Sequence, residues 1–196
     1  MQRRTQRCLG ALVLFALLAL LTACGGSNDS TSADNTTPAA TTGHNDADVM
    51  FAQGMIAHHE QAIEMAQMAV TKATSPDVVD LANQIQDAQQ PEIDTMTGWL
   101  KSWDESADDM GGMDHSSMGD GGMTGMMTPE DMQALTKASG AEFDQMWLEM
   151  MIEHHEGAID MARTELADGE STDAKALAQD IIDAQQAEIT TMKGLL

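Results

Sequence analysis

One stretch of this chain occurs twice, and the repetition limits what the chain can fold into. Residues 55–66 (MIAHHEQAIEMA) return 96 residues later as residues 151–162 (MIEHHEGAIDMA). Other residues keep the same offset, in the pairs Asp48 and Asp144, Gln89 and Gln185, Glu92 and Glu188, and Met96 and Met192. A solenoid unit is about 20–50 residues long, so this spacing is too wide for one. The repetition therefore predicts one duplicated substructure.

Each copy of the repeat predicts two long amphipathic helices. In the first copy, apolar residues recur with a helical period over residues 46–73 and, after a Ser-Pro-Asp start signal, up to about residue 103. The second copy predicts a short helix at about 128–138 and long helices at about 141–167 and 171–196. Two amphipathic hairpins can bury their apolar faces against each other. The predicted fold is therefore all-α, a four-helix bundle made of two duplicated helical hairpins, 46–103 and 128–196, packed as one domain.

The helical wheel of the first hairpin places one set of side chains in the core. They are Phe51, Met55, Ala62, Ile63, Ala66, Ala69, Val70, Leu81, Ile85, Ala88, Ile93, Met96 and Leu100. Pro91 lies inside the second helix, where the other copy has Ala187. An interior proline costs about 3 kcal/mol and commonly kinks a helix, so we expect a bend near residues 87–91.

The first 23 residues are typical of an export signal. Three arginines precede an apolar run, Leu9 to Leu21, that is shorter than the roughly 20 residues needed to span a bilayer. The run ends in Leu-Thr-Ala-Cys24-Gly, which resembles a bacterial lipobox and implies cleavage before a lipidated Cys24. An ordinary signal peptide with an incidental cysteine, or a short uncleaved anchor, are the alternatives. Residues 24–45 then form a disordered tether, and we expect the protein on the outer side of the cytoplasmic membrane or in the periplasm.

Charge and cysteine content narrow the chemistry further. The formal net charge is −23, which repels nucleic acid and attracts cations. The two cysteines, Cys8 and Cys24, lie in the signal and at the lipidation site, so methionine is the soft metal ligand left to the exported chain. No nucleophilic triad or phosphate-binding glycine loop is present. We expect neither a nucleic-acid partner nor an enzyme.

Histidine, methionine and acidic residues share the predicted apolar faces. The candidate metal ligands in the helices are Met55, His58, His59, Met151, His154 and His155. Possible inward polar partners and neighbours are Asp48, Gln89, Glu92, Met96, Asp144, Gln185, Glu188 and Met192. A buried imidazole or carboxylate is costly unless it is paired or ligated, so the same arrangement in two copies indicates a use. Alternatively, His and Glu pair across each hairpin to fix its register, and the methionines only pack.

The linker between the copies, residues 104–127, loses helical periodicity and carries a second candidate site. It contains six methionines and one histidine, at Met110, Met113, His115, Met118, Met123, Met126 and Met127. Their neighbours are mostly glycine and polar residues, so core packing does not explain them. Thioether sulfur with imidazole is a soft donor set that selects Cu(I) or Ag(I). The alternative is a flexible linker whose methionines are oxidation targets.

With these motifs, both copies resemble domain-of-unknown-function family 305, a ferritin-like helical family of exported bacterial proteins, some of which are linked to copper. The family order of Asp, Phe, Met and His-His corresponds here to Asp48, Phe51, Met55, His58 and His59. The second copy has Trp147 in place of the phenylalanine. The resemblance implies a ferritin-like bundle, and it implies copper only through some members.

We therefore predict a membrane-tethered lipoprotein that binds copper, as Cu(I), for sequestration or homeostasis. A metal-dependent oxidoreductase in a ferritin-like bundle is one alternative, although ferritin-like di-iron sites use Glu-x-x-His pairs that this chain lacks. A structural or partner-binding bundle without metal is another. The sequence leaves open whether the linker and the bundle share one ion.

Overall fold

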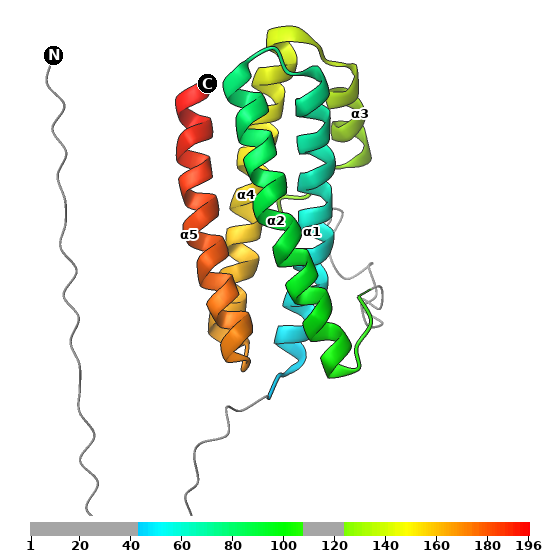
Figure 1. Ribbon diagram of the computed structural model, residues 1–196, viewed down its shortest axis with the longest axis vertical. Coiled ribbons are helices and arrows are strands. Elements are labelled where there is room, and N and C mark those ends of the chain that lie inside the picture. Colours follow the sequence, from blue (N-terminus) through cyan, green and yellow to red (C-terminus); the bar gives the residue numbers. More distant parts are fainter. Residues whose placement is uncertain (1–42, 108–123) are drawn as a thin grey trace, which may run out of the picture. The chain divides into compact units, whose positions relative to one another are not determined.

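A computed structural model describes residues 43–107 and 124–196 of the protein. This part of the chain forms five helices and no strand: α1 (Asp46–Lys72), α2 (Pro76–Trp103), α3 (Pro129–Lys137), α4 (Gly140–Asp168) and α5 (Thr172–Leu195) (Figure 1). The all-α prediction is confirmed, and each helix begins and ends within one residue of its predicted bounds. The predicted signal peptide, Cys24 and most of the tether lie outside the described residues. None of the helices described combines the length and apolarity needed to cross a membrane.

The long helices form two hairpins that pack through α1 and α4. α1 lies along α2, α4 lies along α5, and the α1–α4 seam is the main contact between the hairpins (Figure 1). The Asn45 side chain, at the start of α1, donates to the carbonyl of Asp168 at the end of α4, at 2.8 Å. At the other end, the backbone N–H of Thr74 donates to Asp144, near the start of α4, at 2.9 Å. The two central helices are therefore antiparallel.

The apolar core consists of two clusters placed along the α1–α4 seam. One joins the first half of α1 to the second half of α4, with Phe51 and Met55 near Ala158. The other joins the second half of α1 to the first half of α4, with Met65 near Trp147. Because the helices are antiparallel, residues 58 and 154 fall between the two clusters. The middle of the seam is thus the place where the core changes from apolar to polar.

The predicted core is corrected at two positions. Val70 is 41% exposed, and Ala88 is exposed as well. On α1 the buried stripe passes through Met65 and Ala69, and Val70 lies 100° around the helix from Ala69. On α2 the stripe passes through Ile85 and Gln89. Val70 and Ala88 therefore lie outside the buried stripes of their helices and face solvent.

Pro91 does not end α2, which continues as α-helix from Pro76 to Trp103. Its side chain is exposed. The predicted bend at residues 87–91 stays a prediction.

Candidate metal centre

Two histidines, one from each copy of the repeat, meet in the middle of the bundle. The ring centroids of His58 on α1 and His154 on α4 are 3.8 Å apart, with their planes at 45°. Both residues are buried, with exposures of 0% and 1%. They occupy the same position of the two repeats, so the pseudo-twofold axis of the duplicated hairpins passes between them.

Burial keeps both rings neutral. Burial, followed by the proximity of His59, lowers the pKa of His58 to about 3. Burial, followed by the proximity of His58 and His155, lowers the pKa of His154 well below its ordinary value. A low-dielectric environment disfavours the imidazolium, and a neighbouring imidazole adds to this effect. Each ring therefore carries one unprotonated nitrogen at physiological pH, which can accept a hydrogen bond or bind a metal.

The other two histidines pair with glutamates inside their own hairpins. His59 Nε2 lies 2.6 Å from Glu92 Oε2 on α2, and His155 Nε2 lies 2.7 Å from Glu188 Oε2 on α5. The histidine side chains are 0% exposed, whereas the glutamate side chains are 19% and 18% exposed. We refer to His58, His59, His154 and His155 together as the histidine layer.

A short segment of the linker lies over this layer. Residues 124–127, which we call the strap, contact both α1 and α4. The carbonyl of Thr124 accepts from His58 Nε2 at 3.3 Å. The Gln61 side chain donates to the carbonyl of Met127 at 2.9 Å and accepts from its N–H at 2.7 Å. The end of the methionine-rich linker is therefore attached to the histidine layer.

Gly157 allows the strap to approach α4. A Cβ atom on Gly157 would lie 2.1 Å from the carbonyl oxygen of Thr124 and 2.7 Å from Cα of Gly125. Gly125 has a φ of +80°, and a Cβ there would lie 2.8 Å from the carbonyl oxygen of Glu153. Gly157 is the counterpart of Gln61 in the repeat. The strap is therefore held at the same repeat position in both copies. On α1 the Gln61 side chain bonds it, and on α4 the missing side chain of Gly157 lets it approach.

Several buried nitrogens of the layer have no hydrogen-bond partner among the described residues. They are Nδ1 of His58, His59 and His155, and both ring nitrogens of His154. In His58, His59 and His155 the Nε2 atom faces a carbonyl or carboxylate oxygen, which accepts a hydrogen bond from it. For His58, whose ring is neutral, the proton is accordingly assigned to Nε2 and the lone pair to Nδ1. The layer presents unused donor atoms for a cation.

The described residues also limit which cation fits. No group of three or more His, Cys, Asp or Glu side chains in residues 43–107 and 124–196 is placed to hold a metal ion. Methionine sulfur is the other soft donor close to this layer. Met55 and Met151 each lie one helical turn before a layer histidine, on the same helix face, and both are 0% exposed. Imidazole with thioether suits Cu(I) or Ag(I) and does not suit Mg²⁺ or Ca²⁺.

The remaining predicted residues are distributed as follows. Asp48 and Asp144 lie at opposite ends of the bundle, where they accept backbone N–H groups of Ser171 and Ser75. Met96 and Met192 pack in the two apolar clusters, and Met127 packs in the same cluster as Met192. The other candidates in the described residues are buried Gln89 and Gln185 and half-buried Met126. Met110, Met113, His115, Met118 and Met123 lie outside the described residues.

The burial of the two aspartates would by itself raise their pKa values. Hydrogen bonds outweigh that effect and lower the pKa of each: from Asn45, Ser171, the Glu165 side chain and Glu170 to Asp48, and from Thr74 and Ser75 to Asp144. Both side chains therefore act as ionised acceptors at the bundle ends.

Sequence reasoning predicted Met126 and Met127 of the strap as linker metal ligands, but it did not identify Gln61, Gly157 or the contact of the strap with the histidine layer. The signal was present as the change from Gln to Gly inside an otherwise matched stretch of the repeat. This change could not be interpreted from the sequence, because it concerns the contact of Gln61 with Met127, 66 positions away in the chain. A helical wheel contains no such contact.

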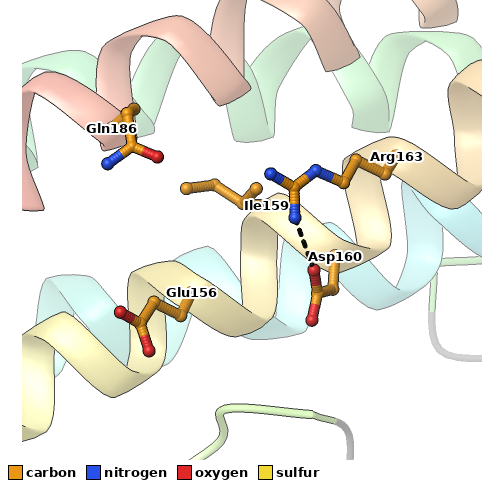
Figure 2. Close-up of a pocket in the computed structure, with 5 residues that line it drawn as sticks. All are labelled: Glu156, Ile159, Asp160, Arg163 and Gln186. Atoms are coloured by element: carbon orange, nitrogen blue, oxygen red, sulfur yellow. Dashed lines mark hydrogen bonds and ion pairs between the residues drawn. The ribbon is translucent and has the colours of Figure 1, made fainter.

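A surface hollow of about 310 Å³ lies between α4 and α5 (Figure 2). It is lined by Glu156, Ile159, Asp160, Arg163 and Gln186. The guanidinium of Arg163 donates to Asp160 at 3.0 Å, and both side chains are 62% exposed (Figure 2). No predicted site residue lines this hollow.

Known proteins match most of the length of this chain. The family model for a domain of unknown function, DUF305, matches residues 48–196. The crystal structure of a DUF305 protein of Streptomyces coelicolor, described as secreted, has a TM-score of 0.70 and 32% identity over 76% of this chain and 91% of that chain. A DUF305 fragment from Deinococcus radiodurans has a TM-score of 0.67 and 28% identity over 77% and 95% of the two chains.

The structure is also similar to CopM in its Cu(I)-bound form, with a TM-score of 0.62 and 32% identity over 76% of this chain and 94% of that chain. CopM in Cu(II)-bound, silver-bound and apo forms is similar too. No curated protein matches the chain.

Proposed function

This chain belongs to the DUF305 family, and from that premise we propose that it binds copper, as Cu(I), through its buried histidine layer and its methionine-rich linker. The observation that carries the proposal is the set of buried ring nitrogens that have no partner in the part of the chain that the structure describes: Nδ1 of all four layer histidines and Nε2 of His154. A buried polar atom left unsatisfied costs about 1–3 kcal/mol. A cation that accepts these lone pairs would offset that cost.

The donor chemistry favours a soft cation. The proposed ligands in the bundle are the Nδ1 atoms of the layer with the sulfur atoms of Met55 and Met151. The proposed ligands in the linker are Met110, Met113, His115, Met118, Met123, Met126 and Met127. CopM, which shares this fold, has structures with Cu(I), Cu(II) and silver. Of these, Cu(I) and silver are the cations expected for a site of imidazole and thioether.

We further propose that the protein acts outside the cytoplasm and sequesters copper there. The Streptomyces coelicolor relative is described as secreted. A lipid on Cys24 would hold the domain at the membrane, and the net charge of −23 would raise the local concentration of cations. Intact mass of the exported protein tests the anchor: the proposal requires a chain that begins at a diacylated Cys24.

An architectural role without metal is the second candidate. The His59–Glu92 and His155–Glu188 pairs favour it, because each joins the helices of one hairpin at a fixed register. Buried pairs of this kind can specify an arrangement without adding stability.

A competitive titration separates the two functions. Residues 25–196 are titrated with Cu(I) against a chromophoric chelator, beside two variants. One has residues 108–123 replaced by a glycine-serine segment of equal length, and the other carries His58→Gln with His154→Gln. We expect both variants to retain helical circular dichroism and each to lose part of the bound Cu(I). A wild-type protein that holds no Cu(I) against the chelator would overturn the proposal and leave the architectural role.

A further inference from the structure

We propose that the strap, residues 124–127, is a positioning element of the histidine layer, which fixes the tautomer of His58 and so prepares its Nδ1 atom to bind a soft cation. This inference rests on the proposed function for the identity of its ligand. The positioning itself rests on contacts between described residues.

The first step is the hydrogen bond between the strap and His58. A carbonyl oxygen only accepts, so the contact of Thr124 O with His58 Nε2 at 3.3 Å places the ring proton on Nε2. The Nδ1 lone pair is then free, and Nδ1 has no other partner in the part of the chain that the structure describes. Metal-binding histidines generally donate their second ring nitrogen to a carbonyl or carboxylate in this way.

The same arrangement recurs at two more rings of the layer. Glu92 and Glu188 accept from Nε2 of His59 and His155, as the carbonyl of Thr124 does from His58. Only His154 lacks such a partner among the described residues. The strap therefore makes the two copies of the repeat unequal, because it fixes the tautomer of His58 and leaves that of His154 free.

The second step is the attachment of the strap. The amide of Gln61 bonds both the N–H and the C=O of Met127, at 2.7 and 2.9 Å, as a neighbouring strand would. Gly157 lets the backbone of the strap lie against α4, where a Cβ would meet Thr124 O at 2.1 Å. The oxygen that this Cβ would meet belongs to the backbone, so it cannot move aside by a side-chain rotation. Gln61 and Gly157 are thus predicted to control the tautomer of a histidine that neither of them bonds.

The third step is the connection of the strap to the rest of the linker. The strap directly follows residues 108–123 in the chain. Its attachment at the α1–α4 seam holds residues 124–127, the last residues of the linker, beside the histidine layer. The strap is thus the segment of chain through which the linker reaches the bundle.

The test uses Gly157→Ala in the full chain as the cell exports it, with Gly98→Ala as the matched control. Gly98 is also helical, but a Cβ there meets nothing within 4 Å. Three readouts are taken: amide hydrogen exchange at Met127, the ¹⁵N shifts of the His58 ring in the metal-free protein, and Cu(I) affinity by competition. We expect Gly157→Ala to speed exchange at Met127, to remove the single Nε2–H tautomer of His58, and to weaken Cu(I) binding by roughly 10–100-fold. Gly98→Ala should change none of these.

Gln61→Ala provides a second variant if Gly157→Ala does not fold, because it removes both bonds to Met127 without adding bulk. Rapid exchange at Met127 with an unchanged His58 tautomer would overturn the inference. An altered tautomer with unchanged Cu(I) affinity would overturn the link between strap and metal, although copper binding itself would stand. A wild-type protein without Cu(I) affinity would overturn the proposed function and, with it, the metal-binding role of the strap. Loss of the His58 tautomer in Gly157→Ala would still support the positioning contact.

Discussion

Asp48, in the first turn of α1, accepts a hydrogen bond from the backbone N–H of Ser171 at 2.9 Å, although the two residues are 123 positions apart. Ser171 is the N-cap of α5. The other copy repeats the contact, with Asp144 accepting from the N–H of Ser75, the N-cap of α2, at 2.9 Å. The amide groups at the start of a helix lack intrahelical partners, and a carboxylate there also favours the helix dipole. Each hairpin therefore caps the second helix of the other.

These contacts predict a loss of stability when the caps are removed. Asp48→Ala and Asp144→Ala should each lower the free energy of unfolding by about 1–3 kcal/mol, because buried backbone N–H groups lose their acceptor. Urea titration followed by circular dichroism measures the change. Asp87→Ala, at an exposed position of α2, is the control and should stay within about 0.5 kcal/mol of wild type. A similarly small effect for Asp48 or Asp144 would contradict the capping role.

Glu165 introduces an asymmetry between the two ends of the bundle. It is 1% exposed, and its counterpart in the first copy is Ala69. Gly169 leaves room for the carboxyl group, since a Cβ there would lie 2.2 Å from Glu165 Oε1. Burial, followed by the hydrogen bond and charge of Asp48, raises the pKa of Glu165 to about 8. As a carboxylate, Glu165 has no hydrogen-bond partner among the described residues, whereas its neutral acid form can donate to the carboxylate of Asp48.

This shift predicts the direction of a pH dependence. Between pH 4.5 and about 8 the folded state holds the Glu165 proton and the unfolded chain does not. The stabilising contribution is thus complete below the unfolded pKa and is lost as pH rises through the folded pKa, by at most about 1.4 kcal/mol per pH unit. Glu165→Gln, which stays neutral, should remove this slope and be more stable than wild type at pH 8.5. Urea titrations at pH 5, 7 and 8.5 measure it, and parallel profiles for the two proteins would refute it.

The fold was predictable from the sequence because its determinants are local and periodic. The start signal at Ser75 and the apolar periods fix the helices within one residue. Prediction failed at Val70 and Ala88 because a wheel gives the direction of a side chain but not the width of the contact with its neighbours.

The candidate site was predictable only in part. His58 and His154 were identified because two buried imidazoles in matching positions are improbable by chance. The roles of Asp48 and Gln61 were not identified from the sequence, because each side chain bonds backbone groups of a distant segment. A backbone partner of this kind has no side-chain pattern, so it is visible only in three dimensions.

Pro91 allows a comparison between the two copies. An interior proline removes one helical hydrogen bond and costs about 3 kcal/mol, and the second copy has Ala187 at the same position. Pro91→Ala should therefore raise the free energy of unfolding by about 1–3 kcal/mol, and Ala187→Pro should lower it by about 3 kcal/mol. Urea midpoints at an unchanged slope measure both changes. An unchanged midpoint for Pro91→Ala would show that the packing of α2 has already absorbed the proline.

Silver can separate a site in the bundle from a site in the linker. A ligand stabilises a protein only as far as it binds the folded state better than the unfolded chain, and 100-fold excess over Kd contributes about 2.7 kcal/mol. Ag(I) held by the histidine layer should therefore raise Tm by roughly 5–10 °C for a chain of this size. Ag(I) held only by linker methionines, which are equally available after unfolding, should leave Tm almost unchanged.

Thermal melts with Ag(I), Zn²⁺ and Mg²⁺ test this in wild type and in the His58→Gln, His154→Gln double variant. We expect a shift with Ag(I) in wild type, none with Mg²⁺, and loss of the Ag(I) shift in the double variant. Binding of Ag(I) without any shift in Tm would place the metal outside the histidine layer.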